Sequence, residues 1–317
     1  MRAVFLDKQT FSSTIDFSSI EQTVTELDCY DITSPREVIT RCINADIIIT
    51  NKVLLTAEIL TALPQLKLIC ITATGYNNVD IDAARKHNIA VTNVSGYSSQ
   101  SVAQYVFAQL LEYYQQISHH NNNTEQGLWS SSKSFCYHGN GFHELAGKTL
   151  GIVGYGNLGK AVETIALAFD MKVLISERPN TTQKRSGRVS FNEVITQADI
   201  ITLHCPQTPD TEKLINSDVL SRMKSSAVLI NTARGPLVDE QALFEGLVNN
   251  EIAYAIIDVL TQEPPPENHP LLMTHLSNLK VTAHIAWASF ESQQRLIELV
   301  AKNIQGFTQG EQLNRLD

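Results

Sequence analysis

Positive charge is scarce in this sequence, and the scarcity excludes several classes of partner. Lysine and arginine total 24, against 33 aspartate and glutamate residues, so the net charge is −9. A surface of this sign argues against a protein that binds nucleic acid or an anionic membrane. An anionic substrate would therefore need basic groups placed locally around it.

Long apolar runs and closely paired cysteines are also missing. No apolar run approaches the roughly 20 residues of a membrane span, and the segment MRAVFLDK has no signal-peptide pattern, so we expect a cytoplasmic protein. The five cysteines form no CxxC pair and are interpreted as buried thiols. No spacing of histidine, cysteine or carboxylate residues indicates a metal site, and we interpret the pair His119 and His120 as part of a solvated loop over residues 118–126.

The chain does contain two series of short apolar runs that alternate with helix-compatible segments, and its length suits two domains. Uninterrupted Ile, Val and Leu runs of this length are typical of parallel strands buried on both faces. In the first hundred residues we predict strands at 3–6, 46–50, 68–71 and 89–92, and helices at 35–42, 56–62 and 79–87. In the second series we predict strands at 149–153, 172–176, 200–204, 227–231, 253–258 and 279–283.

Six strands with intervening helices match a complete doubly wound nucleotide-binding sheet. Two further helices are predicted, at 101–117 and 290–307. The first of these, together with the loop that contains Trp129, lies outside both series of strands. The helix and the loop each need another surface that covers their apolar side chains.

The segment GIVGYGNLGK at 151–160 places Gly154, Gly156 and Gly159 at GxGxxG spacing. In a dinucleotide-binding turn the first glycine permits the tight turn, the second lets backbone amides approach the pyrophosphate, and the third lets the helix pack on the strand. Alone this spacing is weakly specific. Here a predicted strand precedes it and a predicted helix follows it, which is the context that a dinucleotide requires.

The next predicted strand leads to Glu177, about 20 residues beyond the glycines, where an acid binds a ribose 2′-hydroxyl. A solvated loop carboxylate is the simpler alternative, but the position in the βαβ unit favours the ribose. We therefore expect NAD(H) to be preferred over NADP(H), because the carboxylate would repel a 2′-phosphate. Arg178, with Arg185 and Arg188 downstream, leaves open that an arginine accommodates such a phosphate.

Three motifs at the carboxyl ends of the later strands carry a guanidinium, a carboxylate and an imidazole. Arg234 can bind a carboxylate in a bidentate fork. Glu263 can hold one nitrogen of His284, raise its pKa and fix its tautomer, which makes His284 a general acid or base near neutral pH. Each residue alone has a structural explanation, but their combination with the glycine loop favours catalysis. The motifs are NTARG at 231–235, EPPPENHPLL at 263–272 and TAHIAW at 282–287.

These motifs resemble those of the D-isomer-specific 2-hydroxyacid dehydrogenases, and the likeness runs the whole length of the chain. Within that family the chain is most similar to the glycerate dehydrogenases, also called hydroxypyruvate reductases, and HIAWAS with Trp287 indicates this subgroup. The segments that carry the resemblance are NTARG, DVL with EPP at 258–265, HIAWAS at 284–289, ATGYNNVD at 73–80 and LAGKTLGIVGYGNLG at 145–159.

The resemblance implies an α/β fold with two doubly wound parallel-sheet domains. Residues 99–286 would form a Rossmann NAD-binding domain, and residues 1–98 and 287–317 would together form a flavodoxin-like substrate-binding domain. The active cleft would then lie between the two domains, and their closure would exclude water from the reaction. The family likeness also implies a homodimer.

The resemblance further assigns the site residues. It makes Arg234, Glu263 and His284 the catalytic set, and it places the substrate carboxylate at Arg234 and at backbone amides around Thr74 and Gly75. The cofactor residues that it implies are Gly154, Gly156, Asn157, Leu158 and Gly159 at the pyrophosphate, Glu177 at the ribose, and Cys205, Thr232, Ala233 and Asp258 towards the nicotinamide.

Two positions depart from the family pattern. Ala283 stands where the family usually has proline before the catalytic histidine, which would loosen the loop holding His284. Gln104 stands where many members have glutamate, so no charged role is transferred to it.

The sequence therefore predicts an NAD-dependent enzyme that interconverts hydroxypyruvate and D-glycerate, with glyoxylate as a secondary substrate. The alternatives are a reductase of D-lactate, glyoxylate or other 2-ketoacids and, from another class, an NAD-sensing co-repressor. A phosphorylated substrate is disfavoured, because Lys52 is the only basic group that we can place near the carboxylate site.

Overall fold

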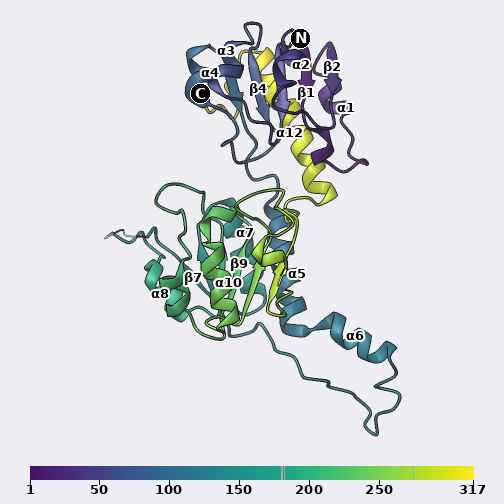
Figure 1. Cartoon of the computed structure of the whole chain (residues 1–317), viewed down its shortest axis with the longest axis vertical. Coiled ribbons are helices and arrows are strands. Elements are labelled where there is room, and N and C mark those ends of the chain that lie inside the picture. Colours follow the sequence, from purple (N-terminus) through teal and green to yellow (C-terminus); the bar gives the residue numbers. More distant parts are fainter. Residues whose placement is uncertain (180, 182, 274) are drawn as a thin grey trace. The chain divides into compact units, whose positions relative to one another are not determined.

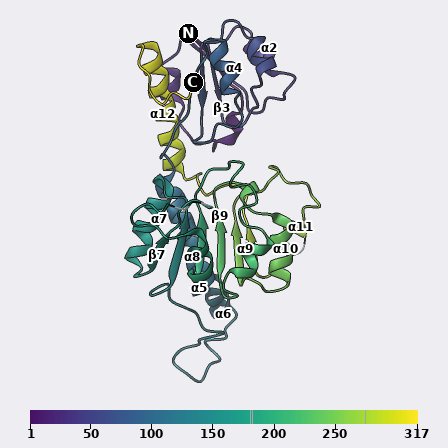
Figure 2. The same cartoon turned by 90° about the vertical axis from the view of Figure 1, so that its left-hand side faces the viewer.

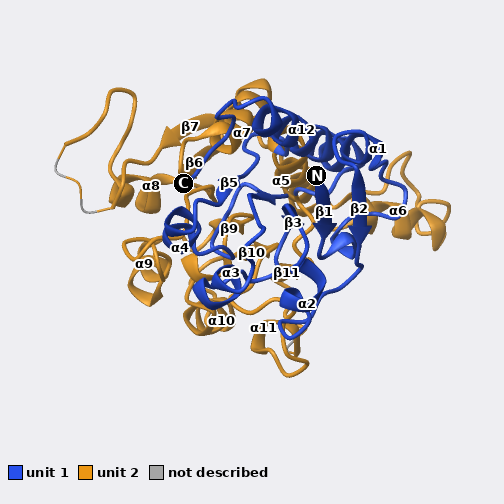
Figure 3. Cartoon of the chain, turned by 90° about the horizontal axis from the view of Figure 1, so that it is seen from above, with its two compact units in different colours: residues 1–98, 287–317 blue, residues 99–286 orange. Residues whose placement is uncertain are grey.

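The computed structural model describes residues 1–179, 181, 183–273 and 275–317. The chain divides into two compact units (Figure 3). Unit 1 comprises Met1–Ser98 and Trp287–Asp317, and unit 2 comprises Ser99–Ala286. Each unit is built around one parallel sheet, so the predicted α/β fold with two parallel-sheet domains is confirmed.

The sheet of unit 1 has five parallel strands, and the sequence predicts four of them. These strands are β1 (Arg2–Phe5), β2 (Glu26–Cys29), β3 (Ile47–Thr50), β4 (Leu68–Ile71) and β5 (Ala90–Thr92). Their order, β2-β1-β3-β4-β5, is that of a flavodoxin-like doubly wound sheet. The sequence gives no signal for β2, because it is an edge strand that carries Glu26 and Asp28 and buries no residue completely.

Helices cover both faces of this sheet (Figures 1 and 2). They are α1 (Ser18–Glu21), α2 (Val38–Cys42), α3 (Ala57–Thr61), α4 (Ile81–Lys86) and α12 (Phe290–Thr308), with a short 3-10 helix at Lys8–Thr10. Successive residues of β3 point to opposite faces, so Ile47 and Ile49 pack in one apolar cluster and Ile48 in another. The first cluster includes Leu296 and Val300 of α12, so the last helix completes the core of the N-terminal segment.

The sheet of unit 2 contains all six strands predicted for it. They are β6 (Thr149–Val153), β7 (Lys172–Ile175), β8 (Ile200–Leu203), β9 (Val228–Asn231), β10 (Tyr254–Ile257) and β11 (Leu279–Val281), all parallel. Their order is β11-β10-β9-β8-β6-β7. The direction of winding therefore reverses between β6 and β8, and in open α/β sheets ligands bind at such a reversal, beyond the carboxyl ends of the strands.

The helices of unit 2 begin with α5, which packs against α7. The rings of Phe107 and Phe169 stack 5.5 Å apart at this contact. No helix among the described residues is long and apolar enough to cross a membrane. The helices are α5 (Ser99–Gln115), α6 (Ile117–Glu125), α7 (Asn157–Ala168), α8 (Phe191–Gln197), α9 (Ser217–Arg222), α10 (Glu240–Val248) and α11 (Pro270–Met273), with a 3-10 helix at Gly235–Leu237.

The loop predicted at 118–126 is wrong, because these residues form most of α6. Asparagine and histidine have low intrinsic helix propensity, which is why the sequence pattern favours a loop. In the structure, side chains one turn apart bond to each other or to the backbone: Asn123 Nδ2 lies 3.0 Å from His119 Nε2, and the Thr124 hydroxyl donates to the His120 carbonyl oxygen at 3.1 Å. Gln116, with a φ of +50°, separates α6 from α5.

Candidate active site

The loop between β6 and α7 has the geometry of a dinucleotide-binding turn. Gly154 has a φ of +97°, and a Cβ there would lie 2.3 Å from the backbone nitrogen of Cys205, so only glycine fits. A Cβ on Gly159 would lie 2.4 Å from the Gly154 carbonyl oxygen. A Cβ on Gly156 would meet nothing within 4 Å, so open space lies beside the N-terminus of α7. The loop therefore fits a pyrophosphate, which backbone N–H groups at a helix N-terminus bind.

A cavity of about 470 Å³ connects this loop with the ends of the neighbouring strands. Its walls include Gly154 and Gly156, Glu177 after β7, and Cys205 after β8. Four of the predicted cofactor-binding residues are thus brought together at the reversal of the sheet. Two more of them form the first turn of α7, Asn157 and Leu158.

The two side chains directly after β8, those of His204 and Cys205, are uncharged. Burial lowers the pKa of His204 to about 4 and raises the pKa of the Cys205 thiol to about 11, so neither group is ionised at neutral pH. His204 Nε2 lies 2.9 Å from the Thr202 hydroxyl, which holds the ring in place. The cavity wall at Cys205 is therefore uncharged, which suits a flat, uncharged ring.

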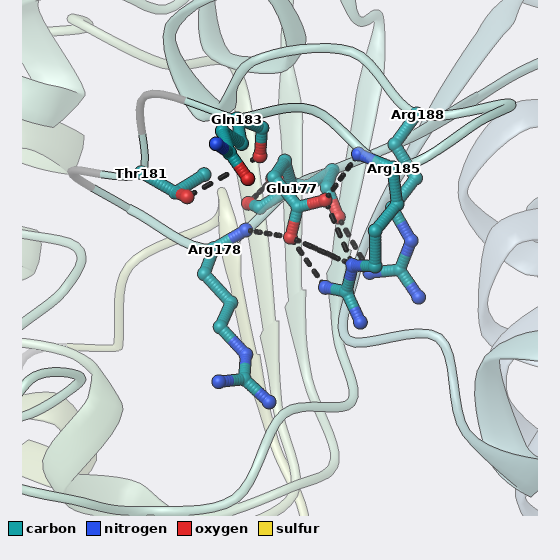
Figure 4. Close-up of polar contacts among 7 residues, drawn as sticks. Glu177, Arg178, Thr181, Gln183, Arg185 and Arg188 are labelled. Carbon is teal, nitrogen blue, oxygen red and sulfur yellow. Dashed lines mark hydrogen bonds and ion pairs between the residues drawn. The ribbon is translucent and has the colours of Figure 1, made fainter.

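The carboxylate of Glu177 is buried, with 4% of the residue exposed, and it is bonded by its own chain (Figure 4). Oε1 accepts from the Arg178 N–H at 2.8 Å. Oε2 accepts from the Arg185 N–H at 3.0 Å and from Arg185 Nε at 2.9 Å, and Arg185 Nη2 donates to Oε1. These bonds hold the pKa of the Glu177 carboxyl well below its usual range. The group is therefore charged, and Arg185 already neutralises it.

The turn after β9 is held by the side chain of Asn231. Its Nδ2 donates to the Arg234 carbonyl oxygen at 2.8 Å, and its Oδ1 accepts from the Ala233 N–H at 3.0 Å. Ala233 and Thr232 are buried, and the Thr232 hydroxyl has no hydrogen-bond partner within the described ranges. A buried hydroxyl without a partner fits the predicted contact with the nicotinamide end of the cofactor.

Arg234 emerges from this turn with its guanidinium free of carboxylates. Its Nη1 donates to the Ala233 carbonyl oxygen at 2.6 Å, and no aspartate or glutamate of the described chain pairs with it. The next residue, Gly235, approaches Leu260 so closely that a Cβ would lie 2.0 Å from the Leu260 carbonyl carbon. The loops after β9 and β10 are therefore packed backbone to backbone, with a guanidinium available for an anion.

His284 and Glu263 form a hydrogen-bonded pair. His284 Nδ1 lies 2.7 Å from Glu263 Oε2, and Glu263 Oε1 accepts from the Leu260 N–H at 2.9 Å. The side chains are 23% and 34% exposed. A carboxylate on Nδ1 fixes the tautomer in which Nδ1 carries a proton, which leaves Nε2 to exchange a proton with a substrate. This arrangement is that of a general acid or base with its orienting carboxylate.

Asp258 holds the backbone that carries His284. Its Oδ1 accepts from the Thr282 hydroxyl at 2.7 Å and from the Ile285 N–H at 3.0 Å, and its Oδ2 accepts from the Ala286 N–H at 2.9 Å. His284 has a φ of +55°, in the left-handed region, which costs a residue other than glycine about 1–3 kcal/mol. The Asp258 bonds offset this cost and fix the direction of the imidazole.

A tyrosine that the sequence analysis does not identify extends this network. The Tyr105 hydroxyl on α5 is hydrogen-bonded to the Thr282 hydroxyl, and burial raises the pKa of Tyr105. Ala283, which replaces the usual proline, lies inside the segment held in this way. No sequence motif marks Tyr105, because its partner lies 177 residues away.

A second cavity, of about 430 Å³, lies at the His284 pair. Asp258, Glu263, Thr282 and His284 line it together with the apolar Pro264, Pro265 and Leu272. Arg234 follows β9, the strand next to β10, and β10 in turn neighbours β11. The three predicted catalytic residues therefore follow three adjacent parallel strands at one edge of the sheet.

Thr74 and Gly75 belong to unit 1, in the loop after β4. The Thr74 hydroxyl donates to the Val94 carbonyl oxygen at 2.9 Å, and Asn93 Nδ2 donates to the Thr74 carbonyl oxygen at 2.7 Å. The backbone N–H groups of Thr74 and Gly75 donate to no acceptor in the part of the chain that the structure describes. Two unused amides after a parallel strand suit an anionic group.

Comparisons with known proteins agree on one family. The family described as D-isomer specific 2-hydroxyacid dehydrogenase, NAD binding domain, matches residues 107–286. A glycerate dehydrogenase of Methylorubrum extorquens is 40% identical over 314 residues, covering 99% of this chain and 98% of the relative. A hydroxypyruvate reductase of Blautia hydrogenotrophica is 36% identical over 321 residues, covering 99% of each chain.

Solved structures show the same fold. An acyclic imino acid reductase in complex with NADPH and D-Arg superposes with a TM-score of 0.85 at 30% identity, and the match covers all of both chains. The comparisons thus agree with one another over both units of the chain.

Proposed function

Because the chain belongs to the D-isomer-specific 2-hydroxyacid dehydrogenase family, with an NAD(P)-binding domain and 2-ketoacid reductase activity, we propose that it interconverts hydroxypyruvate and D-glycerate. The relatives named glycerate dehydrogenase and hydroxypyruvate reductase support this substrate, since each aligns with nearly the whole chain. The observation that carries the proposal is the His284–Glu263 pair, 2.7 Å apart, at the strand edge where Arg234 lies free of carboxylates.

His284 and Glu263 would handle the proton of the reaction. In the reducing direction, the protonated imidazole donates from Nε2 to the oxygen that develops negative charge, while Glu263 stabilises the imidazolium through Nδ1. In the oxidising direction, the neutral imidazole accepts the hydroxyl proton. The left-handed backbone at His284, held by Asp258, keeps Nε2 in one place throughout.

Arg234 would bind the substrate carboxylate. A planar guanidinium forms two parallel hydrogen bonds with a carboxylate, which fixes the orientation of the 2-carbon as well as its position. The backbone amides of Thr74 and Gly75, which donate to no acceptor among the described residues, are also proposed as binding groups for a substrate carboxylate.

NAD(H) is the proposed cofactor, and it supplies the hydride. Gly154, Gly156 and Gly159 would cradle its pyrophosphate with Asn157 and Leu158, as the open space at Gly156 permits. Towards the nicotinamide we propose contacts from Cys205, Thr232, Ala233 and Asp258. Glu177 remains the proposed residue at the adenosine ribose.

The test is a substrate comparison with NADH and purified protein. We expect kcat/KM to be highest for hydroxypyruvate, lower for glyoxylate, and lower still for pyruvate and phosphohydroxypyruvate. One methylene or hydroxyl in the pocket changes preference by only about 1–3 kcal/mol, so glyoxylate should be reduced measurably. A higher kcat/KM for pyruvate would indicate a D-lactate dehydrogenase instead, and no oxidation of NADH by any of the four would favour the co-repressor alternative.

A homodimer is proposed from the exposed arm of unit 2, which we define as α6 together with residues 126–144. The arm extends away from the sheet of unit 2 (Figures 1 and 2). It exposes large apolar side chains, with Trp129 52%, Phe135 91% and Phe142 53% exposed. Exposed apolar side chains gathered on one segment mark an interaction surface. Light scattering at micromolar concentration should give twice the chain mass, and a monomer would refute this assembly.

A further inference from the structure

The segment 282–286, which carries His284, has little apolar packing to hold it. Ala283 is exposed, and Ile285 is 50% exposed. The His284 N–H donates to the Asp258 carbonyl oxygen at 2.8 Å, but the Ala283 N–H donates to no acceptor within the described ranges. His284 also keeps a backbone conformation that is unfavourable for a residue with a side chain. The direction of its imidazole therefore depends on side-chain hydrogen bonds to the segment.

The carboxylate that makes these bonds, Asp258, is buried without a cation. The residue is 1% exposed, and no lysine, arginine or histidine of the described chain forms an ion pair with it. Three donors satisfy its side chain instead, the Thr282 hydroxyl and the N–H groups of Ile285 and Ala286. A buried polar group that loses a hydrogen-bond partner is destabilised, so Asp258 depends on each of these donors.

Tyr105 of α5 supports one of the three donors. The Thr282 hydroxyl has a single hydrogen, which it donates to Asp258 at 2.7 Å. In the bond between the Tyr105 and Thr282 hydroxyls, Tyr105 is therefore the donor. Hydrogen bonds in a chain polarise one another, so the donation from Tyr105 strengthens the bond that Thr282 makes to Asp258.

We propose that Tyr105 is a positioning residue for the reaction, which fixes the direction of the His284 imidazole through Thr282 and Asp258. Its hydroxyl acts on the segment and not on the substrate. A proline at position 283 would fix one backbone angle next to His284 directly. Ala283 leaves that angle free, and Tyr105 restrains the preceding residue instead. This inference rests on the proposed role of His284 as the general acid or base.

Tyr105→Phe removes the hydroxyl and keeps the ring. We expect kcat to fall by about threefold to tenfold, the size of one hydrogen bond, because the imidazole is held less precisely. KM for NADH should not change. Steady-state kinetics should use whichever of the four keto acids above the native protein reduces fastest, so that the result does not depend on hydroxypyruvate.

Tyr113→Phe is the matched control, because it removes the same atom from the same helix. The Tyr113 ring packs against those of Tyr114 and Tyr254, and its hydroxyl has no hydrogen-bond partner in the part of the chain that the structure describes. Its kcat should equal that of the native protein. A loss as large as that of Tyr105→Phe would show a general effect on α5 and would overturn the proposal.

A double variant tests the route through Thr282. If Tyr105 acts only on the Thr282 hydroxyl, it has nothing to act on in Thr282→Val. The double variant Tyr105→Phe with Thr282→Val should therefore have the same kcat as Thr282→Val alone. A loss equal to the product of the two single losses would show that Tyr105 acts by another route, which contradicts the proposal.

Hydrogen exchange measured by mass spectrometry, without cofactor or keto acid, tests the restraint itself. The N–H groups of Ile285 and Ala286 bond to Asp258, so they exchange when the segment opens. Peptides that contain them should exchange about threefold to tenfold faster in Tyr105→Phe and at the native rate in Tyr113→Phe.

The two readouts separate failure of this inference from failure of the proposed function. Unchanged exchange in Tyr105→Phe, or faster exchange with a native kcat, would overturn the positioning role. If the native protein oxidises NADH with none of the four keto acids, the proposed function is refuted. Exchange then still decides whether Tyr105 holds the segment of His284.

Discussion

Glu177 and Glu263 follow strands towards opposite ends of the sheet of unit 2, and each carboxylate pairs with a different kind of basic group. Glu177 after β7 accepts hydrogen bonds from four N–H groups, one of them shared between its two oxygens, and pairs with an arginine, which is always charged. Glu263 after β10 accepts one bond from a backbone N–H and faces an imidazole. An arginine–carboxylate pair is electrostatically fixed near neutral pH, whereas a histidine–carboxylate pair changes charge there.

The difference between the pairs follows from their surroundings. The Glu177 side chain is 3% exposed and that of Glu263 34%, so the second carboxylate is far more accessible to solvent. Hydrogen bonds from four N–H groups hold the first carboxylate in one position. The second pair keeps a ring nitrogen available, which chemistry requires. Substitutions in the two pairs should therefore change different properties of the enzyme.

The largest effect is expected from His284→Gln, which removes the proposed general acid. Loss of a general acid typically costs about 10²–10⁴-fold in rate, so kcat should fall by this factor. NADH affinity, measured by fluorescence titration, should stay within about twofold, because the imidazole acts on the keto acid. A kcat close to that of the native enzyme would show that the proton comes from another group.

Arg234→Lys should come next, at roughly 10–100-fold in kcat/KM for hydroxypyruvate. The positive charge is kept, but the planar fork that matches a carboxylate is lost, which removes about 1.5–3 kcal/mol of hydrogen bonding. Steady-state kinetics at several hydroxypyruvate concentrations measure the effect. If kcat/KM of Arg234→Lys equals that of the native enzyme, another group binds the substrate carboxylate.

Glu263→Gln sharpens the comparison through pH. Without the carboxylate, the imidazolium loses its partner on Nδ1. Reduction needs the proton that the imidazolium donates, so the rate profile of reduction should shift to lower pH. Profiles of kcat/KM from pH 5 to 9 test this, and Glu177→Gln is the comparison variant, since its partner Arg185 does not titrate there. An unmoved profile in Glu263→Gln would make Glu263 purely structural.

The smallest effect is expected from Thr282→Val, which removes one bond to Asp258 while Ile285 and Ala286 keep theirs. A typical protein hydrogen bond contributes about 1 kcal/mol net, and this one acts on the imidazole only through the backbone, so kcat should fall by roughly threefold to tenfold. KM for NADH should not change. Restoration of kcat by Thr282→Ser, which keeps the hydroxyl, would confirm a positioning role, and equal losses in both variants would contradict it.

Much of this organisation was predictable from the sequence, because it depends on local patterns. The apolar runs predict all six strands of unit 2, and the residues that follow three adjacent strands predict where Arg234, Glu263 and His284 lie. The spacing of Gly154 and Gly159 has a local steric cause that the structure displays, since a Cβ at either position would overlap backbone atoms.

The contacts between distant residues were not predictable in the same way. Arg185 contacts Glu177 only in the folded loop after β7. The sequence shows an arginine at this position but does not show which side chain it contacts. Tyr105 meets Thr282 across 177 residues. The edge strand β2 has no alternating apolar pattern, and α6 depends on bonds such as His119 with Asn123 that no propensity scale contains. Such features arise from tertiary packing rather than from periodicity.

The discontinuity of unit 1 has a consequence for how the chain is made. Residues 99–286 form unit 2 as one uninterrupted stretch, whereas the core of unit 1 needs Leu296 and Val300 of α12. During synthesis, domains fold as their residues emerge. All residues of unit 2 are therefore synthesised before α12, the last helix of unit 1. Unit 2 can fold before unit 1, although synthesis of unit 1 begins first.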